Sequence, residues 1–470
     1  MRQTSSLEVK KSCRRALTYE ISPFSLFSLW LREVRILILS LNFAPELTGA
    51  GKCTADFTAW LRDRGHEVRV ITAPPYYPEW RVGNAYTAWA WRRETFGAAG
   101  VLRCPLWVPA AVTPLARILH LLSFAASSLL PCLWQAARFR PDLIWTVEPT
   151  VMAAPAALLA ARLCGAQACL HVQDLETEAA CGLGLVQQPR LCSLLRRSYG
   201  WLVRRFDLVS TICTHMRARL RRVGVAEERL CLFPNWVDTH AIRPLAGPNR
   251  LRFELGLADH VIALYAGSMG EKQGVEVLVE VAERLRARPE IRLVLCGAGA
   301  ARPRLERRLA GCDNVTLLPL QPEARLNELL GAADVHLLPQ RPEAATFALP
   351  SRLAAILASG RPLVAQAENG ELAAATRRCG ILVPPGDARA MAEAVLELAA
   401  DPARRARLGA AARQLAEDHL QREAILARYE QRLLWLVSRQ AIARRRDDAR
   451  HAARSVDPLL ARTPAHLRRG

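Results

Sequence analysis

The chain has 470 residues, of which 51% are hydrophobic and 23% are charged, and its formal net charge at pH 7 is +20. This length predicts about two to three domains, and this composition excludes a disordered chain. The 13 cysteines include no Cys-x-x-Cys pair, so neither a zinc site nor a disulfide framework is expected. A positive charge of this size is typical of proteins that meet an anionic membrane, a nucleic acid or a phosphorylated ligand.

Residues 1–33 form a basic and apolar extension before the first predicted strand. A basic cluster precedes the apolar run ISPFSLFSLWL and consists of Lys10, Lys11, Arg14 and Arg15. The run is short and no small-residue cleavage site follows it, which is not typical of a signal sequence. Two interpretations remain open: a segment that contacts a membrane, or residues that lie upstream of the native start.

Short apolar runs indicate the strands of parallel sheets, because strands that are buried on both faces are apolar throughout. The first series comprises residues 34–40, 67–73, 142–147, 168–172, 207–211 and 229–233. The second series comprises residues 261–267, 291–297, 314–320, 334–339, 362–367 and 380–385. Two successive doubly wound, Rossmann-like α/β domains are therefore predicted, and they are expected to face each other across a cleft.

The stretch from about Trp236 to Leu257, which contains proline and glycine, is expected to join the two domains. We place the first domain at residues 34–240 and the second at 241–415. A helix at 416–436 is expected to return to the first domain. The Arg-rich residues 437–470 lack a sustained apolar face, which predicts a solvated tail.

The segment LARILHLLSFAASSLLPCLWQAARFR (115–140) is nearly long enough to cross a bilayer, but it contains His120, Pro131, Gln135 and three serines. One interpretation is a buried helix of the first domain. The other is a helix that rests on the surface of an anionic membrane, with arginines at both ends.

Residues 44–54, APELTGAGKCT, resemble the end of a phosphate-binding P-loop directly after the first strand. A P-loop needs a glycine where Glu46 stands, and it needs a hydroxyl side chain where Cys53 stands. An ATP or GTP site is therefore not expected here.

The sequence has only four lysines, and two of them, Lys52 and Lys272, lie in glycine-containing loops just after the first strand of each domain. The loops are TGAGK (48–52) and AGSMGEKQG (266–274). Chance can produce this placement. The functional interpretation is that both loops approach phosphates, because glycines permit close backbone contact and helix N-termini attract anions.

In the second domain, Lys272 stands beside the first turn of a predicted helix, and ALPSRLAAILASG (348–360) starts another. Pro350 and Ser351 precede that second helix, and Arg352 is expected in its first turn. A diphosphate held between these cations and two helix N-termini would need no divalent metal. The chain also contains no Asp-x-Asp motif.

The segment HVQDLETEAA (171–180) places polar side chains directly after a predicted strand of the first domain. His171 falls at the end of the strand, where a hydrogen-bonded core histidine is the alternative to a functional one. Asp174 is expected to face the cleft on the acceptor side, because loops beyond parallel strands form the binding edge of such sheets. Glu176 and Glu178 lie in the same loop.

The order of several motifs resembles that of the family 4 glycosyltransferases, which have the GT-B fold and retain the configuration of the anomeric carbon. The motifs are LFPNWVD (232–238), AGSMGEKQG, LCGAGA (296–301), residues 318–339 and the segment that begins GILVPPGDARAMAEAVLELAADP. In the first domain, VITAPPYYPEW and HVQDLE are similar to a narrower group that acts in colanic acid and O-antigen synthesis. The resemblance covers residues 34 to about 430.

The resemblance implies transfer of a sugar from a GDP- or UDP-linked donor, with GDP-fucose among the candidates. The implied acceptor is a polyprenyl-diphosphate-linked glycan in bacterial exopolysaccharide or O-antigen assembly. The implied location is the cytoplasm, peripherally on the anionic inner face of the membrane. No cofactor, metal or nucleic acid partner is expected.

The resemblance also implies roles for individual residues. Glu46 would lie near the transferred sugar or the acceptor, Asp174 would orient the acceptor and Lys272 would act on the leaving diphosphate. The glycine loop, with Gly49, Gly51 and Lys52, would lie across the cleft from the donor diphosphate. The implied donor-binding residues are Gly267, Ser268, Lys272, Gly297, Gly299, Leu320, Gln321, Pro350, Ser351 and Arg352.

The sequence departs from the family pattern at two places. Phe347 and Ala355 stand where the family has the carboxylates of its Glu-x7-Glu signature, and Ser268 stands where an arginine is frequent. A contact to the donor ribose therefore stays unassigned. The alternatives to a transferase are a nucleotide-sugar epimerase of the same fold and a non-catalytic basic scaffold or nucleic-acid-binding protein.

Overall fold

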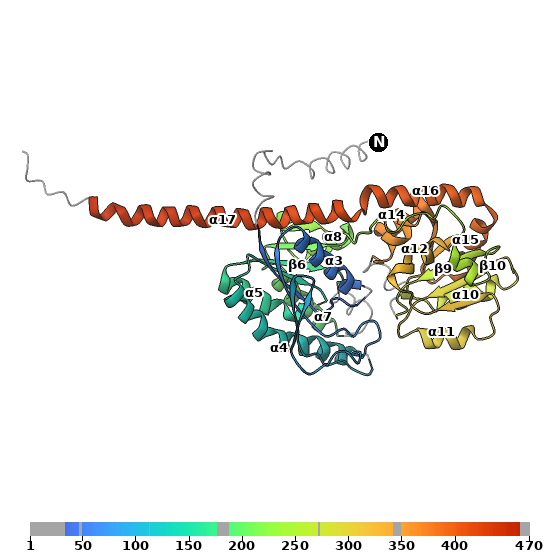
Figure 1. Ribbon diagram of the computed structural model, residues 1–470, viewed down its shortest axis with the longest axis horizontal. Coiled ribbons are helices and arrows are strands. Elements are labelled where there is room, and N and C mark those ends of the chain that lie inside the picture. The colour runs from blue at the N-terminus through green and yellow to red at the C-terminus, as the bar shows by residue number, and fades with distance from the viewer. Residues whose placement is uncertain are drawn as a thin grey trace, which may run out of the picture. The chain divides into compact units, whose positions relative to one another are not determined.

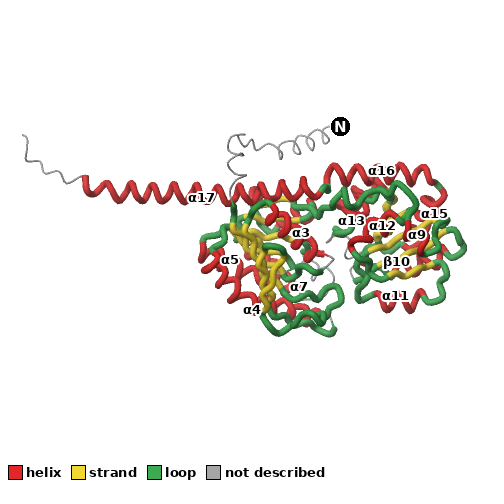
Figure 2. Tube along the Cα trace, viewed as in Figure 1, coloured by secondary structure: helices red, strands yellow, loops and turns green. Residues whose placement is uncertain are grey.

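The computed structural model describes residues 33–46, 49–111, 113–149, 151–175, 188–270, 273–341 and 349–460. Two sheets with covering helices lie in one compact unit, Arg35–Glu430 (Figure 1). Figure 2 shows the strands of each sheet between layers of helix. The other unit comprises Met1–Val34 and Gln431–Gly470, and its described part is mainly the continuation of the last helix.

The first sheet has eight strands in the order β3-β4-β2-β1-β5-β6-β7-β8. All neighbouring strands are parallel except β3 and β4. The strands are β1 (Arg35–Ser40), β2 (Glu67–Thr72), β3 (Arg92–Phe96), β4 (Ala99–Arg103), β5 (Leu143–Val147), β6 (Gln167–Val172), β7 (Leu208–Thr211) and β8 (Leu230–Leu232). The helical segments are α3 (Gly49–Asp63), α4 (Pro114–Phe139), η1 (Val151–Ala153), α5 (Ala154–Cys164), α7 (Pro189–Val203), α8 (Thr214–Arg222) and η2 (Glu227–Arg229).

The second sheet has six strands in the order β11-β10-β9-β12-β13-β14, all parallel. The strands are β9 (Val261–Ala266), β10 (Ile291–Cys296), β11 (Val315–Leu318), β12 (Val335–Leu338), β13 (Leu363–Gln366) and β14 (Gly380–Val383). The helical segments are α9 (Arg250–Glu254), α10 (Val277–Leu285), α11 (Arg302–Leu309), η4 (Glu323–Arg325), α12 (Leu326–Gly331), α13 (Leu353–Ala358), α14 (Gly370–Cys379), α15 (Ala388–Ala400), α16 (Pro402–His419) and α17 (Arg422–Leu460).

The predicted strands are confirmed, with ends that differ by no more than about two residues. Strands β5 and β6 are buried at every position, as their continuous apolar sequences predict. The hairpin of β3 and β4 was missed. Strand β3, with the sequence RRETF, is largely exposed at the sheet edge and carries no apolar run.

Both sheets bury their strands against helices, and an aromatic cluster lies in the core of the first. Phe57 packs edge-on against Trp145, with ring centroids 5.0 Å apart, and Phe233 stacks on Tyr429 at 3.8 Å. Tyr429 belongs to the first turns of α17, so the last helix contributes to the core of the first sheet. Beyond this point α17 continues to Leu460, through an alanine- and arginine-rich sequence that favours helix.

Helix α4 corrects the interpretation of residues 115–140 as a buried helix, because only one of its faces is buried. That face packs Phe124, Cys132 and Phe139 into the core of the first sheet. Among the described residues, Leu115–Phe139 is the one segment long and apolar enough to cross a membrane, and about a quarter of its most apolar window is buried (28%).

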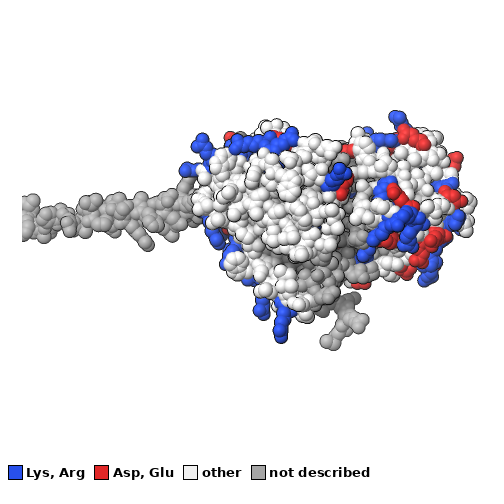
Figure 3. Space-filling model, turned by 90° about the horizontal axis from the view of Figure 1, so that it is seen from below, with Lys and Arg blue, Asp and Glu red and all other residues white. Residues whose placement is uncertain are grey.

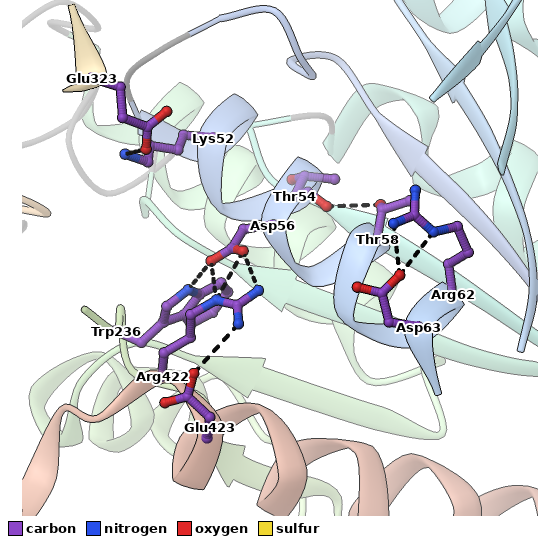
Figure 4. Close-up of polar contacts among 10 residues, drawn as sticks. All are labelled: Lys52, Thr54, Asp56, Thr58, Arg62, Asp63, Trp236, Glu323, Arg422 and Glu423. Atoms are coloured by element: carbon purple, nitrogen blue, oxygen red, sulfur yellow. Dashed lines mark hydrogen bonds and ion pairs between the residues drawn. The ribbon is translucent and has the colours of Figure 1, made fainter. Parts of the chain in front are cut away.

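The chain passes between the two sheets twice, and the two passages run side by side. The backbone N–H of Val237 donates to the carbonyl of Leu420 at 2.9 Å, and the N–H of Arg422 donates to the carbonyl of Val237 at 3.0 Å. Asp56 of α3 accepts hydrogen bonds from the indole of Trp236 and from the Arg422 guanidinium, whose Nε lies 2.9 Å from Oδ1 (Figure 4). Asp56 therefore ties both passages to the helix that carries the glycine loop.

Candidate functional site

The glycine loop begins helix α3, directly beyond the carboxyl end of β1. Gly49 has φ of +63°, which favours glycine, and a Cβ on Gly51 would lie 2.7 Å from Oε2 of Glu46. Lys52 Nζ lies 2.6 Å from Oε1 of Glu323, a residue of η4 whose partnership the sequence did not predict (Figure 4). The predicted loop therefore exists, and it meets the second domain through an exposed ion pair.

Glu46 lies below the glycine loop and is buried. Its carboxylate accepts hydrogen bonds from Asn42 Nδ2 at 2.9 Å and from the backbone N–H groups of Tyr76 and Tyr77 at 3.1 and 3.2 Å. Burial raises the pKa of Glu46 from 4.5 to about 7, although these hydrogen bonds and the charge of Arg103 act in the opposite direction. These contacts give Glu46 a positioning role in the loop, and its catalytic role stays a prediction.

The raised pKa of Glu46 predicts that the contribution of this residue to stability is lost as the pH rises. Between pH 4.5 and about 7 the Glu46 carboxyl is protonated in the folded state and ionised in the unfolded state, so its contribution to the free energy of unfolding falls over this window by about 3 kcal/mol. Glu46→Gln mimics the protonated carboxyl and should lose this contribution to the pH dependence. Urea unfolding of both proteins from pH 5 to 8 checks this, and parallel curves for the two would contradict it.

Tyr77 connects the loop held by Glu46 to the second domain. Its hydroxyl lies 3.3 Å from Oγ of Ser268, which follows β9. Ser268 was predicted to bind the donor, whereas the contact with Tyr77 was not predicted. The loop that follows β2 and the loop that follows β9 therefore meet at the carboxyl ends of their strands, where ligands of doubly wound sheets bind.

Arg352 is held beside the loop that follows β9 by a residue that the sequence analysis missed. The guanidinium stacks on the ring of Tyr265, 4.6 Å from its centroid, and Nη1 donates to the Tyr265 hydroxyl at 3.0 Å. The same hydroxyl donates to the carbonyl of Ser268. A Cβ on Gly267 would lie 2.7 Å from Arg352 Nη1, so glycine makes room for the guanidinium. We call Tyr265, Gly267, Ser268 and Arg352 the arginine cluster.

The arginine cluster differs from the prediction in one detail of helix geometry. Arg352 is the N-cap of α13, which starts at Leu353, and Ser351 is exposed just before it, after Pro350. Within the described part of the chain, Arg352 Nε is a buried donor without a partner. A buried cationic N–H of this kind suits an anion. Lys272, with Glu271, lies outside the described residues, so its predicted role is not placed.

Gly297 and Gly299 follow β10 and pack against the loop that follows β9. A Cβ on Gly297 would lie 1.9 Å from the carbonyl oxygen of Gly267, and one on Gly299 would lie 2.6 Å from that of Met269. The N–H of Met269 donates to the carbonyl of Ala298 at 2.7 Å. These glycines therefore make room for the backbone of the loop that follows β9. Their predicted approach to a nucleotide, and that of Leu320 and Gln321 to its base, stay predictions.

His171 is a core residue, which is the alternative that the sequence left open for it. It is buried at the end of β6, with Nδ1 3.0 Å from Ser210 Oγ and Nε2 2.9 Å from Gln173 Nε2. Burial lowers its pKa to about 3, so the ring is neutral. Asp174 is half-buried two residues after the end of β6, and its acceptor-side role stays a prediction. Glu176 and Glu178 lie outside the described residues.

Three further expectations concern a metal site, the P-loop pattern and the missing carboxylates of the family signature. Within the described ranges, no group of three or more His, Cys, Asp or Glu side chains is placed to hold a metal ion. Cys53, in place of the P-loop hydroxyl, points its thiol at Oδ1 of Asn235, 3.5 Å away. Ala355 lies half-buried in α13, and Phe347 falls outside the described residues.

Comparison with known proteins identifies the family. Residues 48–236 match the model of the glycosyl transferase 4-like domain, and residues 260–401 match that of glycosyl transferases group 1. The chain is 40% identical over 411 residues to the putative colanic acid biosynthesis glycosyl transferase WcaI of Escherichia coli (strain K12). That alignment covers 84% of this chain and 98% of the relative.

Solved structures show the same fold at low sequence identity. Sucrose-phosphate synthase from Thermosynechococcus elongatus is 21% identical, with a TM-score of 0.69 over 88% of this chain and 100% of its own. Anabaena HepE in complex with UDP-glucose is 17% identical, with a TM-score of 0.59 over 86% of this chain and 100% of its own. The two doubly wound domains are thus of the GT-B kind that the sequence predicts. The chain belongs to the family 4-like glycosyltransferases and is a transferase.

Proposed function

We propose that this glycosyltransferase moves a sugar from a nucleotide diphospho-sugar to a polyprenyl-diphosphate-linked glycan, with retention at the anomeric carbon and without a divalent metal. The product would be a bacterial exopolysaccharide of the colanic acid kind, or an O-antigen. The similarity to the E. coli colanic acid transferase over 84% of the chain supports this pathway class. The donor base stays open between GDP and UDP, and GDP-fucose is one candidate sugar donor.

The arginine cluster is the observation that carries the proposal. It places a guanidinium, a hydroxyl and a glycine with φ of +147° beyond the carboxyl end of β9. Arginine offers a fixed fork of N–H donors that matches the oxygens of a phosphate. Tyr265 fixes the fork in place through both its ring and its hydroxyl. A diphosphate is the anionic group of a nucleotide sugar that such a site would hold.

This arrangement suits the departure of a nucleoside diphosphate. As the bond between the anomeric carbon and the diphosphate oxygen breaks, negative charge develops on that oxygen. A cation that is already oriented stabilises this charge without reorganisation. Arg352 is such a cation, and Lys272 is proposed to be the second. In a front-face displacement the leaving phosphate accepts the proton of the acceptor hydroxyl, and Asp174 orients that hydroxyl.

The structures of HepE with UDP-glucose support a nucleotide sugar as the donor. A polyprenyl-linked acceptor would be met at the inner face of the cytoplasmic membrane, so we place the enzyme there as a peripheral protein. The net charge of +20 is compatible with that surface.

Thermal stabilisation by nucleotides tests the donor site. A ligand that binds the folded state alone raises the unfolding temperature in proportion to the logarithm of its concentration over its dissociation constant. We expect stabilisation by GDP or by UDP, unchanged when EDTA replaces Mg²⁺ and absent in Arg352→Ala. ADP serves as the control nucleotide. Equal stabilisation of wild type and Arg352→Ala, or a shift that requires Mg²⁺, would contradict the proposed site.

A further inference from the structure

The outer face of α4 is an apolar surface that the fold leaves uncovered. Every third or fourth residue along this helix points outward, as the helical period requires. Leu130 and Leu115 are 74% and 67% exposed, and Trp134 is 48% exposed. The outer face of the helix carries Leu115, Ile118, Leu119, Leu122, Leu129, Leu130 and Trp134.

Neighbouring elements extend this surface. Helix α5 packs beside α4 and exposes Leu159 and Leu163. Trp91 is also exposed, and its indole nitrogen donates to the carbonyl of Ser127 on α4 at 3.2 Å. We call the outer faces of α4 and α5, together with Trp91, the apolar face.

The charges around the apolar face are almost all positive. The guanidinium of Arg93 lies over the ring of Trp134, 5.5 Å from its centroid, and Arg138, Arg140 and Arg162 are exposed at the ends of the two helices. Neither α4 nor α5 contains an acidic residue. Figure 3, which looks from the side of α4, shows a broad uncharged area with blue side chains at its edges.

The inner face of α4 packs along its length on the first domain, which fixes the orientation of the helix. Phe124 and Cys132 pack into the core, and His120 Nδ1 lies 2.7 Å from the carbonyl of Trp107. A helix that crossed a bilayer would not keep one whole face on a sheet. Helix α4 is therefore built to lie flat, with its outer face toward an apolar phase and its arginines at the level of polar groups.

We propose that the apolar face inserts into the interfacial region of an anionic phospholipid bilayer. Apolar side chains would enter the acyl boundary, the two tryptophans would lie at headgroup depth, and the arginines would meet lipid phosphates. The biological purpose of this contact rests on the proposed function, because the contact would bring the transferase to a membrane-bound acceptor. Its location rests on the surface itself, because apolar residues bordered mainly by cations complement an anionic lipid surface.

Cosedimentation with vesicles tests the proposal on the full-length chain. The vesicles consist of phosphatidylcholine alone, or of phosphatidylcholine and phosphatidylglycerol in equal parts. The test variant carries Leu119→Gln, Leu122→Gln and Leu130→Gln. The control is Phe253→Gln, which removes an exposed apolar side chain from α9 in the second domain.

We expect wild type and the control to bind the anionic vesicles and the triple variant to bind at least about a hundredfold more weakly, because each leucine contributes about tenfold or more when buried. Removing Arg138 and Arg162 by glutamine should weaken binding to the anionic vesicles by about fivefold each and leave binding to neutral ones unchanged.

Three results would overturn the proposal. The first is binding by the triple variant at the wild-type level, which would assign membrane contact to another segment, such as residues 1–33. The second is absence of wild-type binding to either vesicle. The third is a wild-type dimer in solution that the triple variant abolishes, which would make the apolar face an interface between two copies. Stabilisation by GDP or UDP, measured on the same samples, reports on the donor site separately.

Discussion

Replacing Arg352 by alanine is expected to lower the rate of sugar transfer by about two orders of magnitude, the scale typical of losing one oriented charge-stabilising group. Arg352 is the one cation that the described residues place on the arginine cluster, stacked on Tyr265 and within reach of the loop after β9. The loss should appear in kcat as well as in the KM of the donor, because Arg352 is proposed to bind the diphosphate and more negative charge develops on the leaving diphosphate in the transition state. Initial rates with saturating donor and acceptor measure it.

Two further variants separate chemistry from folding in this prediction. Arg284→Ala removes an arginine of the same domain that pairs with Glu280 on the exposed face of α10, and it should leave the rate unchanged. Tyr265→Phe keeps the ring under Arg352 but removes the hydroxyl that joins it to Ser268, so a smaller loss of about tenfold is expected. If Arg352→Ala retains a rate close to wild type, the diphosphate does not bind at the arginine cluster.

Gly297→Ala is expected to destabilise the second domain by about 3 kcal/mol or more. The new Cβ would lie 1.9 Å from the carbonyl oxygen of Gly267, and backbone on both sides prevents either atom from moving aside easily. Its φ of +155° adds a conformational penalty for alanine. Because Gly267 belongs to the arginine cluster, nucleotide stabilisation should be lost together with the stability.

The positions of the tryptophans allow unfolding of the second domain to be distinguished from unfolding of the first. No tryptophan lies between residues 241 and 415 of the sequence, so tryptophan fluorescence reports on the first sheet, whereas far-UV circular dichroism reports on both. We expect an early transition in circular dichroism without a matching change in fluorescence. Gly311→Ala, where φ is +85° and no atom lies near the added Cβ, should show only the conformational penalty, about 1–2 kcal/mol. Equal effects of the two substitutions would refute the role of the backbone contact.

The fold was predictable because its strands are apolar on both faces, a pattern that depends on local sequence alone. The hairpin of β3 and β4 escaped prediction because an exposed edge strand such as RRETF has no such pattern. The glycines that follow β10 were found through the family resemblance, but the backbone contact that requires Gly297 was not. Gly297 admits the carbonyl of Gly267, a contact between two loops that lie 30 positions apart in the chain and that no single stretch of sequence reveals.

The site was predictable only where a residue type itself suggested chemistry. Arg352 was noticed as a cation at the start of a predicted helix and Ser268 through the family resemblance, whereas Tyr265 looked like any aromatic residue of a buried strand. Its role depends on which side chain lies across from it, and this is set by the pairing of distant segments. Glu46 was noticed as a misplaced P-loop residue. Its raised pKa follows from burial, against the hydrogen bonds from Tyr76 and Tyr77, and this burial depends on distant segments that the local sequence does not reveal.

The two passages of the chain between the sheets have a mechanical consequence. The two passages are hydrogen-bonded to each other at Val237, and Asp56 of α3 binds both of them. They therefore form a two-stranded strap that is attached to the first domain at Asp56. Such a strap bends readily about a line across its two strands and resists twisting, because twisting would shear the hydrogen bonds between them. It also means that a backbone cut in the second passage leaves the two sheets covalently joined through the first, whereas a cut in the first passage leaves them joined only through the packing of α17 on the first sheet.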